Sequence, residues 1–460
     1  MEVKDLGPIK SAEIELRRIV VLLGRNNVGK SYLASVIYAL GRSFSQKAVL
    51  QLLMKLALRI SGGGSGVSAF AGDVVETIVK SYEEVVKEEV LRVFTPLDAA
   101  VRWGSNNFLI RLDSEPVKVL IRGTREDVEV DIKFSSDIER EILQGCESIK
   151  KIIEAVGTEE GDTETAARTV TSLILSMGNL EQILQKISER FTFKDPIYLL
   201  AERAGLFRAY RPLLTSYIKA SLPELLSLPR SFKQLIEEIS RESFHISRIT
   251  ADMLTELLME PEMPSKQVGI DEVRDLEQVL EGTVEVTRDL RLIYKREGIS
   301  LPLDKASSLI AELAPLYLAL RKITPGRSLI MEEPEAHVHP KAQVLLAKLF
   351  AKVARRNISI LITTHSMIFP TVFAHLCSLG KIPDEKLKEL GLSREYELRP
   401  EDLAIYWMRW DGDGSVTEQV KVTPPSIEKL PEMDEVAEDL YGEEARLITL
   451  SHLSSGAGSS

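Results

Sequence analysis

Short apolar runs recur along the chain at the places where an α/β protein has buried strands. Residues 19–23 (IVVLL) form a continuous apolar run, which is typical of a strand covered on both faces. Helical patterns follow this run up to Gly41 and begin again at Lys341. The pattern predicts an α/β fold, with a twisted mixed sheet and flanking helices. Further runs predicted to be strands lie at 197–200, 328–331 and 358–364.

Alternation of apolar and polar residues marks a second group of strands. Three such runs predict an antiparallel β lobe near 106–134, namely 108–111, 117–121 and 128–132. The turns between them are expected at Asp113–Ser114 and Gly123–Thr124. Two more hairpins are predicted, over 283–301 with a turn at Glu297–Gly298, and over 403–422 with a turn at 411–414.

Two long stretches, 136–190 and 206–282, are helical in composition and predict a helical insertion. Prolines divide the second stretch, so it lacks the uninterrupted heptads of a long coiled coil. A compact helical hairpin or lid is the better interpretation. The dividing residues are Pro212, Pro223, Pro229, Pro261 and Pro264.

The composition narrows the class of protein. The chain has 460 residues, of which 44% are hydrophobic and 28% charged, so a globular fold with a large core is expected. Two cysteines, Cys146 and Cys377, exclude a disulfide scaffold and suit the cytoplasm. No membrane segment is expected, because polar residues and Pro370 interrupt the best candidate, 358–379. The net charge of −11 argues against general nucleic-acid coating but leaves room for a local basic face.

The strongest chemical signal is GRNNVGKS, which stands between the first buried run and a helical run. In such a loop, successive backbone N–H groups surround phosphate oxygens, and the following helix points its positive end at the same anion. Lys30 is expected to reach the β and γ phosphates, and the Ser31 hydroxyl to bind Mg²⁺. A chance match in a glycine turn is the alternative, which the flanking elements disfavour. The predicted nucleotide contacts are Gly24, Arg25, Asn26, Asn27, Val28, Gly29, Lys30, Ser31 and Tyr32.

Two later runs end in polar residues that suit the same site. Glu332 and Glu333 follow LIM, and we expect Glu332 to bind Mg²⁺ through water and Glu333 to orient and deprotonate the attacking water. His365 follows ILITT, at the strand end where α/β sheets bind ligands, and is expected to contact the γ-phosphate. The alternative for Glu332 and Glu333 is a solvated strand end, and the alternative for His365 is a structural histidine. His337 and His339 suit a turn better than a closed zinc site.

Together, GRNNVGKS, LIMEEPEAHVHP and ITTHS resemble the ATPase heads of the ABC-type class shared by SMC, RecF and OLD (overcoming lysogenization defect) proteins. The chain is most similar to small prokaryotic OLD/RecF-like AAA-family ATPases, and DLGPIKSAEIEL and IYLLAERAGL add to this resemblance over 1–45 and 190–422. The resemblance implies a P-loop NTPase fold of ABC-ATPase-head type, ATP and Mg²⁺ as cofactors, and catalytic roles for Lys30, Glu333 and His365.

The resemblance also implies a signature segment, here 304–309, that places a serine on the γ-phosphate held by the other subunit of a homodimer. Ser307 and Ser308 are the candidates. Leu309 stands where the family has glycine, and an ordinary capped helix is the alternative. The glutamine loop of the family has no clear equivalent. Glu202–Arg203 could occupy that place, with Arg203 either a phosphate or partner contact or one member of an ion pair.

On this basis we divide the chain into four parts. Residues 1–135 form the N-terminal part of the ATPase head, and 136–290 a mainly helical insertion with a core strand near 197–200. Residues 291–425 form the C-terminal part of the head, and 426–460 an acidic helix and a flexible tail. About forty residues follow the last hairpin, fewer than the nuclease domain of OLD nucleases requires.

Two functions from different classes follow from these observations. One is an ATPase that dimerises on ATP and acts with DNA or a partner effector protein in DNA repair or anti-phage defence. The other is a nucleotide-gated binding module with little hydrolysis. This alternative is suggested by Leu309, which stands where the family has glycine. Both require that Lys30 and Glu332, 302 positions apart, meet at one nucleotide.

Overall fold

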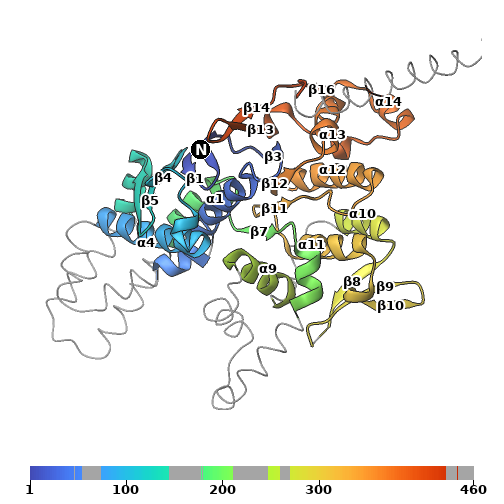
Figure 1. Ribbon diagram of the computed structural model, residues 1–460, viewed down its shortest axis with the longest axis horizontal. Coiled ribbons are helices and arrows are strands. Elements are labelled where there is room, and N and C mark those ends of the chain that lie inside the picture. Colours follow the sequence, from blue (N-terminus) through green and yellow to red (C-terminus); the bar gives the residue numbers. More distant parts are fainter. Residues whose placement is uncertain are drawn as a thin grey trace, which may run out of the picture.

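The computed structural model describes residues 1–45, 47–53, 74–144, 178, 180–210, 247–259, 270–287, 289–430 and 443. One large sheet runs through this part of the chain (Figure 1). Its strands are β1 (Glu2–Leu6), β2 (Ile9–Glu13), β3 (Ile19–Gly24), β4 (Asn107–Ser114), β5 (Val117–Thr124), β6 (Val128–Phe134), β7 (Pro196–Leu199), β11 (Ser328–Glu332), β12 (Ser359–Thr364), β13 (Leu403–Asp411) and β14 (Gly414–Gln419). Their order is β6-β5-β4-β1-β2-β14-β13-β3-β12-β11-β7.

The sheet is mixed, as predicted. The strands β13, β3, β12, β11 and β7 are mutually parallel, and β2 and β14 are parallel as well. The predicted apolar runs form β3, β7, β11 and β12, which are buried along their whole length. Parallel strands end at the same edge of a sheet, so the residues that follow β3, β11 and β12 lie near one another.

The predicted antiparallel β lobe is confirmed as β4, β5 and β6, but its turns were placed too early. Asp113 and Ser114 pair with Lys118 and Val117 inside the β4–β5 ladder, so the first turn falls at 115–116. Gly123 also lies within a strand, β5, where it pairs with Phe108 and where a Cβ atom would overlap the ring of Phe108. The lobe is continuous with the main sheet, since β4 pairs with β1.

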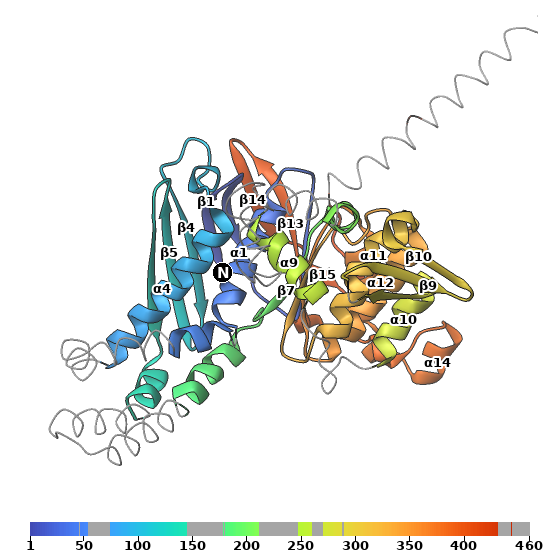
Figure 2. The same ribbon diagram turned by 90° about the horizontal axis from the view of Figure 1, so that it is seen from below.

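Helices cover both faces of the sheet, as Figure 2 shows. One face packs against α1 (Lys30–Ser43) and α4 (Val74–Phe94), the other against α11 (Ser308–Lys322), α12 (Pro340–Arg355) and α13 (Ile368–Leu376). The alternation within β3 explains this: Val20 and Leu22 belong to the core on the α1 side, and Ile19, Val21 and Leu23 to the core on the other side. The prediction of an α/β fold with a mixed sheet and flanking helices is confirmed.

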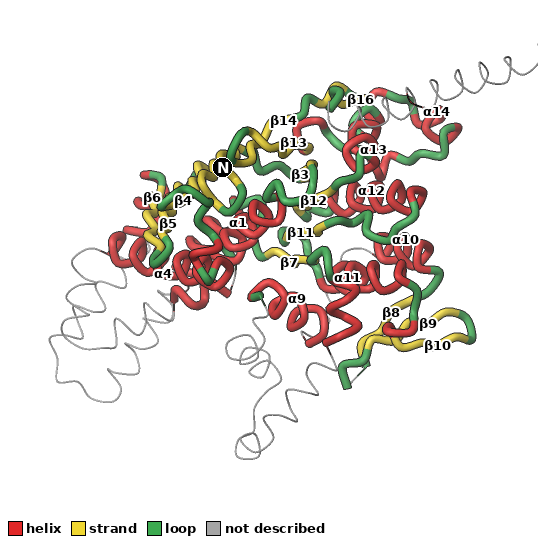
Figure 3. Tube along the Cα trace, in the orientation of Figure 1, coloured by secondary structure: helices red, strands yellow, loops and turns green. Residues whose placement is uncertain are grey.

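Smaller elements complete the fold (Figure 3). An antiparallel sheet of β8 (Thr283–Val286), β9 (Leu292–Arg296) and β10 (Ile299–Pro302) turns at Glu297–Gly298, as predicted, and leads into α11. The other named elements are α9 (Arg248–Met259), α10 (Ile270–Leu280), α14 (Asp384–Glu389), β15 (Val422–Thr423) and β16 (Ser426–Ile427), with short 3₁₀ helices η1 (Leu97–Ala99), η2 (Leu303–Lys305), η3 (Leu379–Lys381), η4 (Arg394–Tyr396) and η5 (Pro400–Asp402).

Most of the predicted helical insertion and of the acidic C-terminal helix lies outside the described residues. Of the insertion, the described parts are helical over 136–144, 180–190 and 203–210 and in α9 and α10. The five dividing prolines and nearly all of 431–460 fall outside the described ranges. Among the helices that the structure describes, none has the length and apolar character needed to cross a membrane.

Candidate nucleotide-binding site

The loop between β3 and α1 has the shape of an anion-binding turn. Gly29 is the N-cap of α1 at φ 90°, and no side chain caps the first amides of the helix. Glycine is required here for a second reason, because a Cβ atom on Gly29 would lie 2.7 Å from Ile9 in β2. The amides at the start of α1 are thus left for a ligand. The side chains of Arg25, Asn26 and Asn27 are exposed around this loop.

Lys30 points back into the loop. Its Nζ donates to the backbone oxygens of Gly24 at 2.9 Å and Arg25 at 2.8 Å, and lies 3.1 Å from Nε2 of His365. Burial lowers the pKa of Lys30 to about 8, although the nearby Glu333, Glu335 and Glu332 favour its charged form. The ammonium group is therefore poorly solvated and, among the described residues, has no carboxylate in direct contact, a state that an incoming phosphate would relieve.

Glu333 completes this cluster from the end of β11. Its Oε1 lies 3.4 Å from Nε2 of His365, and the interaction with His365 lowers the pKa of Glu333. The carboxylate is therefore ionised at neutral pH. The residue adopts φ 42°, and its N–H donates to the backbone oxygen of Thr363 at 2.8 Å. Lys30, Glu333 and His365, predicted separately, are thus brought together in one cluster.

Glu332 faces a different set of groups. It is buried, its Oε1 accepts from the hydroxyl of Tyr198 at 2.7 Å, and its Oε2 accepts from the N–H of Ala201 at 3.1 Å. The Tyr198 hydroxyl also bonds to Ser35, which lies one turn after Ser31 on the same face of α1. Glu332 is consequently attached to the helix that carries Ser31.

Ser31 and Glu332 suit Mg²⁺ in their chemistry. Both offer the hard oxygen atoms that Mg²⁺ prefers, and Mg²⁺ commonly uses one or two protein ligands together with water and phosphate. Ser31 is exposed beside the loop. In the described part of the chain no cluster of three or more His, Cys, Asp or Glu side chains could hold a metal by itself. The residues present therefore fit an ion that arrives with a nucleotide.

Glu335 and His339 have structural roles that the sequence did not indicate. Glu335 accepts the backbone N–H of His365 at 2.6 Å through Oε1, and so fixes the turn that presents this histidine. His339 is the N-cap of α12, and its Nδ1 accepts from the N–H of Lys341 at 3.3 Å. The side chain of His337 is exposed.

The candidate signature residues lie at the start of α11. Ser307 is the N-cap of this helix, and its hydroxyl accepts from the N–H of Ile310 at 3.4 Å. Ser308 is exposed. Among the described contacts neither serine reaches the phosphate loop of its own chain. The geometry agrees with a capped helix and leaves Ser308 open to another molecule.

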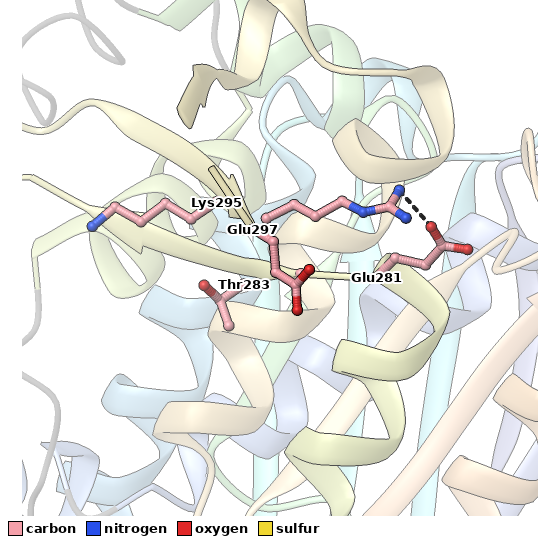
Figure 4. Close-up of a pocket in the computed structure, with 6 residues that line it drawn as sticks. Glu281, Thr283, Lys295 and Glu297 are labelled. Atoms are coloured by element: carbon pink, nitrogen blue, oxygen red, sulfur yellow. Dashed lines mark ion pairs between the residues drawn. The ribbon is translucent and has the colours of Figure 1, made fainter. Parts of the chain in front are cut away.

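A pocket adjoins the loop on the side of α4. It is lined by Ser31, Tyr32 and Ser35 of α1 and by 93–96, Ala99 and Ala100 from the end of α4 and η1. The hydroxyl of Tyr32 donates to the backbone oxygen of Ala99 at 3.1 Å, which joins the two walls. A second pocket, shown in Figure 4, contains none of the predicted site residues. Its lining is Glu281, Gly282, Thr283, Lys295, Arg296 and Glu297.

Several basic residues that could have formed a nucleic-acid face are already paired with acids. Lys352 lies 2.9 Å from Asp275 and 3.0 Å from Glu395. Arg356 pairs with Glu272, and Arg17 with Glu15. Arg203 is buried below the carboxylates, so it is not available to DNA. These groups therefore do not form a row of uncompensated cations.

Comparison with known proteins finds a family match over part of the chain. Residues 181–369 match a family described as an AAA ATPase domain, and this range holds Glu332, Glu333 and His365. No curated protein matches the chain in sequence. Among solved structures, the chain is similar to the SmcHead bound to the C-winged helix domain of ScpA, with 11% identity over 92% of this chain and 96% of that chain and a TM-score of 0.40. It is also similar to the SMC head domain from Thermotoga maritima, with 8% identity over 92% and 98% and a TM-score of 0.33. The family match supports an ATPase of the AAA type.

Proposed function

We propose that this protein binds ATP with Mg²⁺ on the loop Gly24–Ser31 and hydrolyses it, as an OLD/RecF-like member of the ABC-type ATPases. The observation that carries the proposal is the cluster of Lys30, His365 and Glu333. The three residues come from segments far apart in the sequence. Nζ of Lys30 lies 3.1 Å from Nε2 of His365, and this nitrogen lies 3.4 Å from Oε1 of Glu333. Each follows a buried parallel strand, so the cluster stands at the edge of the sheet where ligands bind.

Each residue of the site has a separate role in the proposed hydrolysis. The free amides at the start of α1 bind phosphate oxygens, and Lys30 turns from the carbonyls of the loop to the β and γ phosphates. Ser31 and Glu332 would hold Mg²⁺, which when bound neutralises charge that develops on the phosphates. The ionised Glu333 orients the attacking water and accepts its proton. His365, whose ring lies beside Lys30, donates a hydrogen bond to the γ-phosphate.

The pocket beside Ser31 is the place for the nucleoside. It begins at Ser31, which borders the phosphates, and it extends past Tyr32 to Ala99. Its walls include Phe94, Pro96 and two alanines, which suit the flat faces of a base. In a dimer, Ser308 at the exposed start of α11 reaches the γ-phosphate bound by the partner.

The test is the variant Glu333→Gln. This change keeps the size of the side chain and one acceptor oxygen but removes the charge and the base, so we expect ATP affinity within about threefold of wild type and turnover lowered roughly 100-fold or more. Fluorescent-nucleotide binding and phosphate release measure the two quantities. Glu389→Gln, in the exposed helix α14, is the matched control and should hydrolyse at the wild-type rate. Unchanged turnover in Glu333→Gln contradicts the assignment.

A nucleotide-gated binding module is the second candidate. The observation that favours it is the use of Ser307 as the N-cap of its own helix, followed by Leu309 where close approach to a phosphate needs glycine. Under this proposal ATP closes the dimer while hydrolysis stays slow. Wild-type protein that dimerises with ATP and shows negligible phosphate release, with or without DNA, would favour the module over the ATPase.

DNA or an effector protein is the proposed partner of the closed dimer, in repair or defence. Because Lys352, Arg356 and Arg17 are paired with acids, a DNA phosphate would have to compete with these ion pairs to bind them. Binding measured by gel shift across a salt series tests this directly, because contacts to phosphates weaken steeply as salt rises. No binding at low salt, with or without ATP, would eliminate DNA and leave the protein partner.

A further inference from the structure

We propose that Arg203 is a positioning residue, whose buried guanidinium fixes the backbone of Glu332 and Glu333 and attaches it to α11. The inference rests on the proposed function, because the position of these residues affects a reaction only if they act on a nucleotide. Arg203 follows β7 in the segment AERAG. Its side chain is 0% exposed, so it contacts neither solvent nor a ligand at the surface.

The guanidinium is surrounded by backbone carbonyl groups from three elements. Nη1 donates to the oxygens of Glu332 at 2.7 Å and Leu200 at 3.0 Å, and Nη2 donates to the oxygen of Glu333 at 3.2 Å. Nε donates to the oxygen of Glu312, in α11, at 3.0 Å. One planar group therefore joins the end of β7, the end of β11 and a helix of the covering layer.

Arg203 follows the point at which the pairing of β7 with β11 ends. β7 pairs with Ser328–Met331 of β11, and the last pair is Leu199 with Met331. Beyond this point the carbonyls of Glu332 and Glu333 have no strand on the β7 side. Buried carbonyls need hydrogen-bond donors, and Arg203 provides them. The side chain of Arg203 thus donates, past the end of β7, the hydrogen bonds that a neighbouring strand would otherwise supply.

Glu333 has particular need of this support. It adopts φ 42°, a left-handed conformation that is unfavourable for a residue with a side chain. Its N–H is held by Thr363 and its carbonyl by Arg203. Fixing both groups of the peptide backbone sets the direction in which the carboxylate leaves the chain, toward His365.

The charge of Arg203 is balanced by an acidic residue of α11. Nη2 of Arg203 lies 3.2 Å from Oε2 of Glu312, and both side chains are buried. Glu312 lies one turn after Ser308 in α11. Burial lowers the pKa of Arg203 and raises that of Glu312, and the proximity of the two charges opposes both shifts. The pair consequently links the start of α11, proposed to reach the partner's nucleotide, to the carboxylates of its own site.

Arg327 provides a matched control at the other end of the same strand. It precedes β11, lies 2.9 Å from Asp195 and pairs with Glu256 in a largely buried setting. Arg→Lys at either position keeps the charge but loses the planar fork that reaches several acceptors at once. Both variants are expected to lose stability. Only Arg203→Lys should disturb the carboxylates.

Hydrogen–deuterium exchange on nucleotide-free protein is the first test. In Arg203→Lys, peptides covering 331–337 should exchange about fivefold or more faster, because a backbone without the anchor on its carbonyls opens more easily and exposes N–H groups such as that of Glu333, which donates to Thr363. Arg327→Lys should leave the same peptides within about twofold of wild type. The double variant Arg203→Gln/Glu312→Gln removes both charges together. It is the control for a single variant that fails to fold because one buried charge has lost its partner. Unchanged exchange in a folded Arg203 variant overturns the inference.

Single-turnover hydrolysis is the second test. Arg203→Lys should retain ATP affinity within about threefold but hydrolyse roughly 10- to 100-fold more slowly, since displacement of a reacting group by 1 Å can cost this much. After correction for the folded fraction, equal hydrolysis by Arg203→Lys and Arg327→Lys would show that the role is only structural. If wild type neither binds nor hydrolyses ATP, the proposed function fails and the catalytic role of Arg203 fails with it. The hydrogen-exchange result then decides only whether Arg203 holds the backbone at the end of β11.

Discussion

Lys30 is held by the carbonyls of its own loop and has a lowered pKa of about 8. A bound triphosphate adds negative charge beside the ammonium and raises this pKa, so ATP binding should take up a proton where free Lys30 is partly neutral. Above this pKa most of Lys30 is neutral in the free protein, whereas well below it, near pH 6.5, most is charged. We therefore expect proton uptake at the higher pH only.

Calorimetry measures this uptake as the difference between binding heats in two buffers of unlike ionisation enthalpy. Lys30→Arg is the control, because a guanidinium stays charged throughout this range and should abolish the difference. Equal binding heats in both buffers near pH 8.5 for wild type would contradict the coupling.

The residues that could be predicted from the sequence are those that directly follow an apolar run. Glu333 and His365 each come directly after a buried strand, and Lys30 closes a loop with fixed spacing. Tyr198, Arg203 and Glu335 could not be recognised in the same way. Their partners are backbone groups or side chains distant in sequence, and such contacts leave no periodic signal. The pair Glu202–Arg203 was noticed, but only the fold shows that Arg203 is buried.

At the scale of elements, the wall formed by η1 and the end of α4 gives a prediction about the nucleoside. Ala99 lines the pocket beside Ser31 and is joined to α1 through Tyr32. Ala99→Trp should fill the pocket and weaken ATP binding about tenfold or more, while inorganic tripolyphosphate, which has no nucleoside, should bind within about twofold of wild type. Competition against a fluorescent nucleotide measures both ligands. Equal loss for ATP and tripolyphosphate would show damage to the phosphate loop and not a nucleoside pocket.

The elements themselves were easier to predict than their ends. The three strands of the β lobe follow from alternation, yet Gly123 was assigned to a turn because glycine commonly stands there. In the structure it makes space for the ring of Phe108 across the β4–β5 pair. A glycine required by a neighbouring strand cannot be distinguished by sequence from one required by a turn. The hairpin at 297–298 was predicted correctly because no such neighbour interferes.

At the scale of the whole molecule, the sheet brings together residues that are more than 300 positions apart. A mixed sheet could be predicted from continuous and alternating runs in one chain. The strand order could not, because β13 and β12 both pair with β3 and no local signal specifies either partner. The same holds for the junction of the β lobe with β1. These pairings are set by the packing of two cores on opposite faces of the sheet.

The exposed start of α11 leads to a prediction about assembly. If Ser308 reaches the nucleotide of a second copy, a protein that binds ATP without hydrolysing it should accumulate as a dimer. We expect Glu333→Gln with saturating ATP and Mg²⁺ to have twice the 51.4 kDa mass of one chain, and to be monomeric without nucleotide. Light scattering after size-exclusion chromatography provides the mass.

The matched variant adds Ser308→Asp to Glu333→Gln. An aspartate at this exposed position repels the γ-phosphate of the partner but lies away from the loop that binds ATP in its own chain, so the double variant should bind ATP and remain monomeric. Ser307 is left intact because it caps α11, and its loss would alter the stability of the helix instead. If both variants dimerise equally, the interface does not include Ser308. If Glu333→Gln stays monomeric with ATP bound, the protein does not close on its nucleotide as a dimer, and its switch must act within one chain.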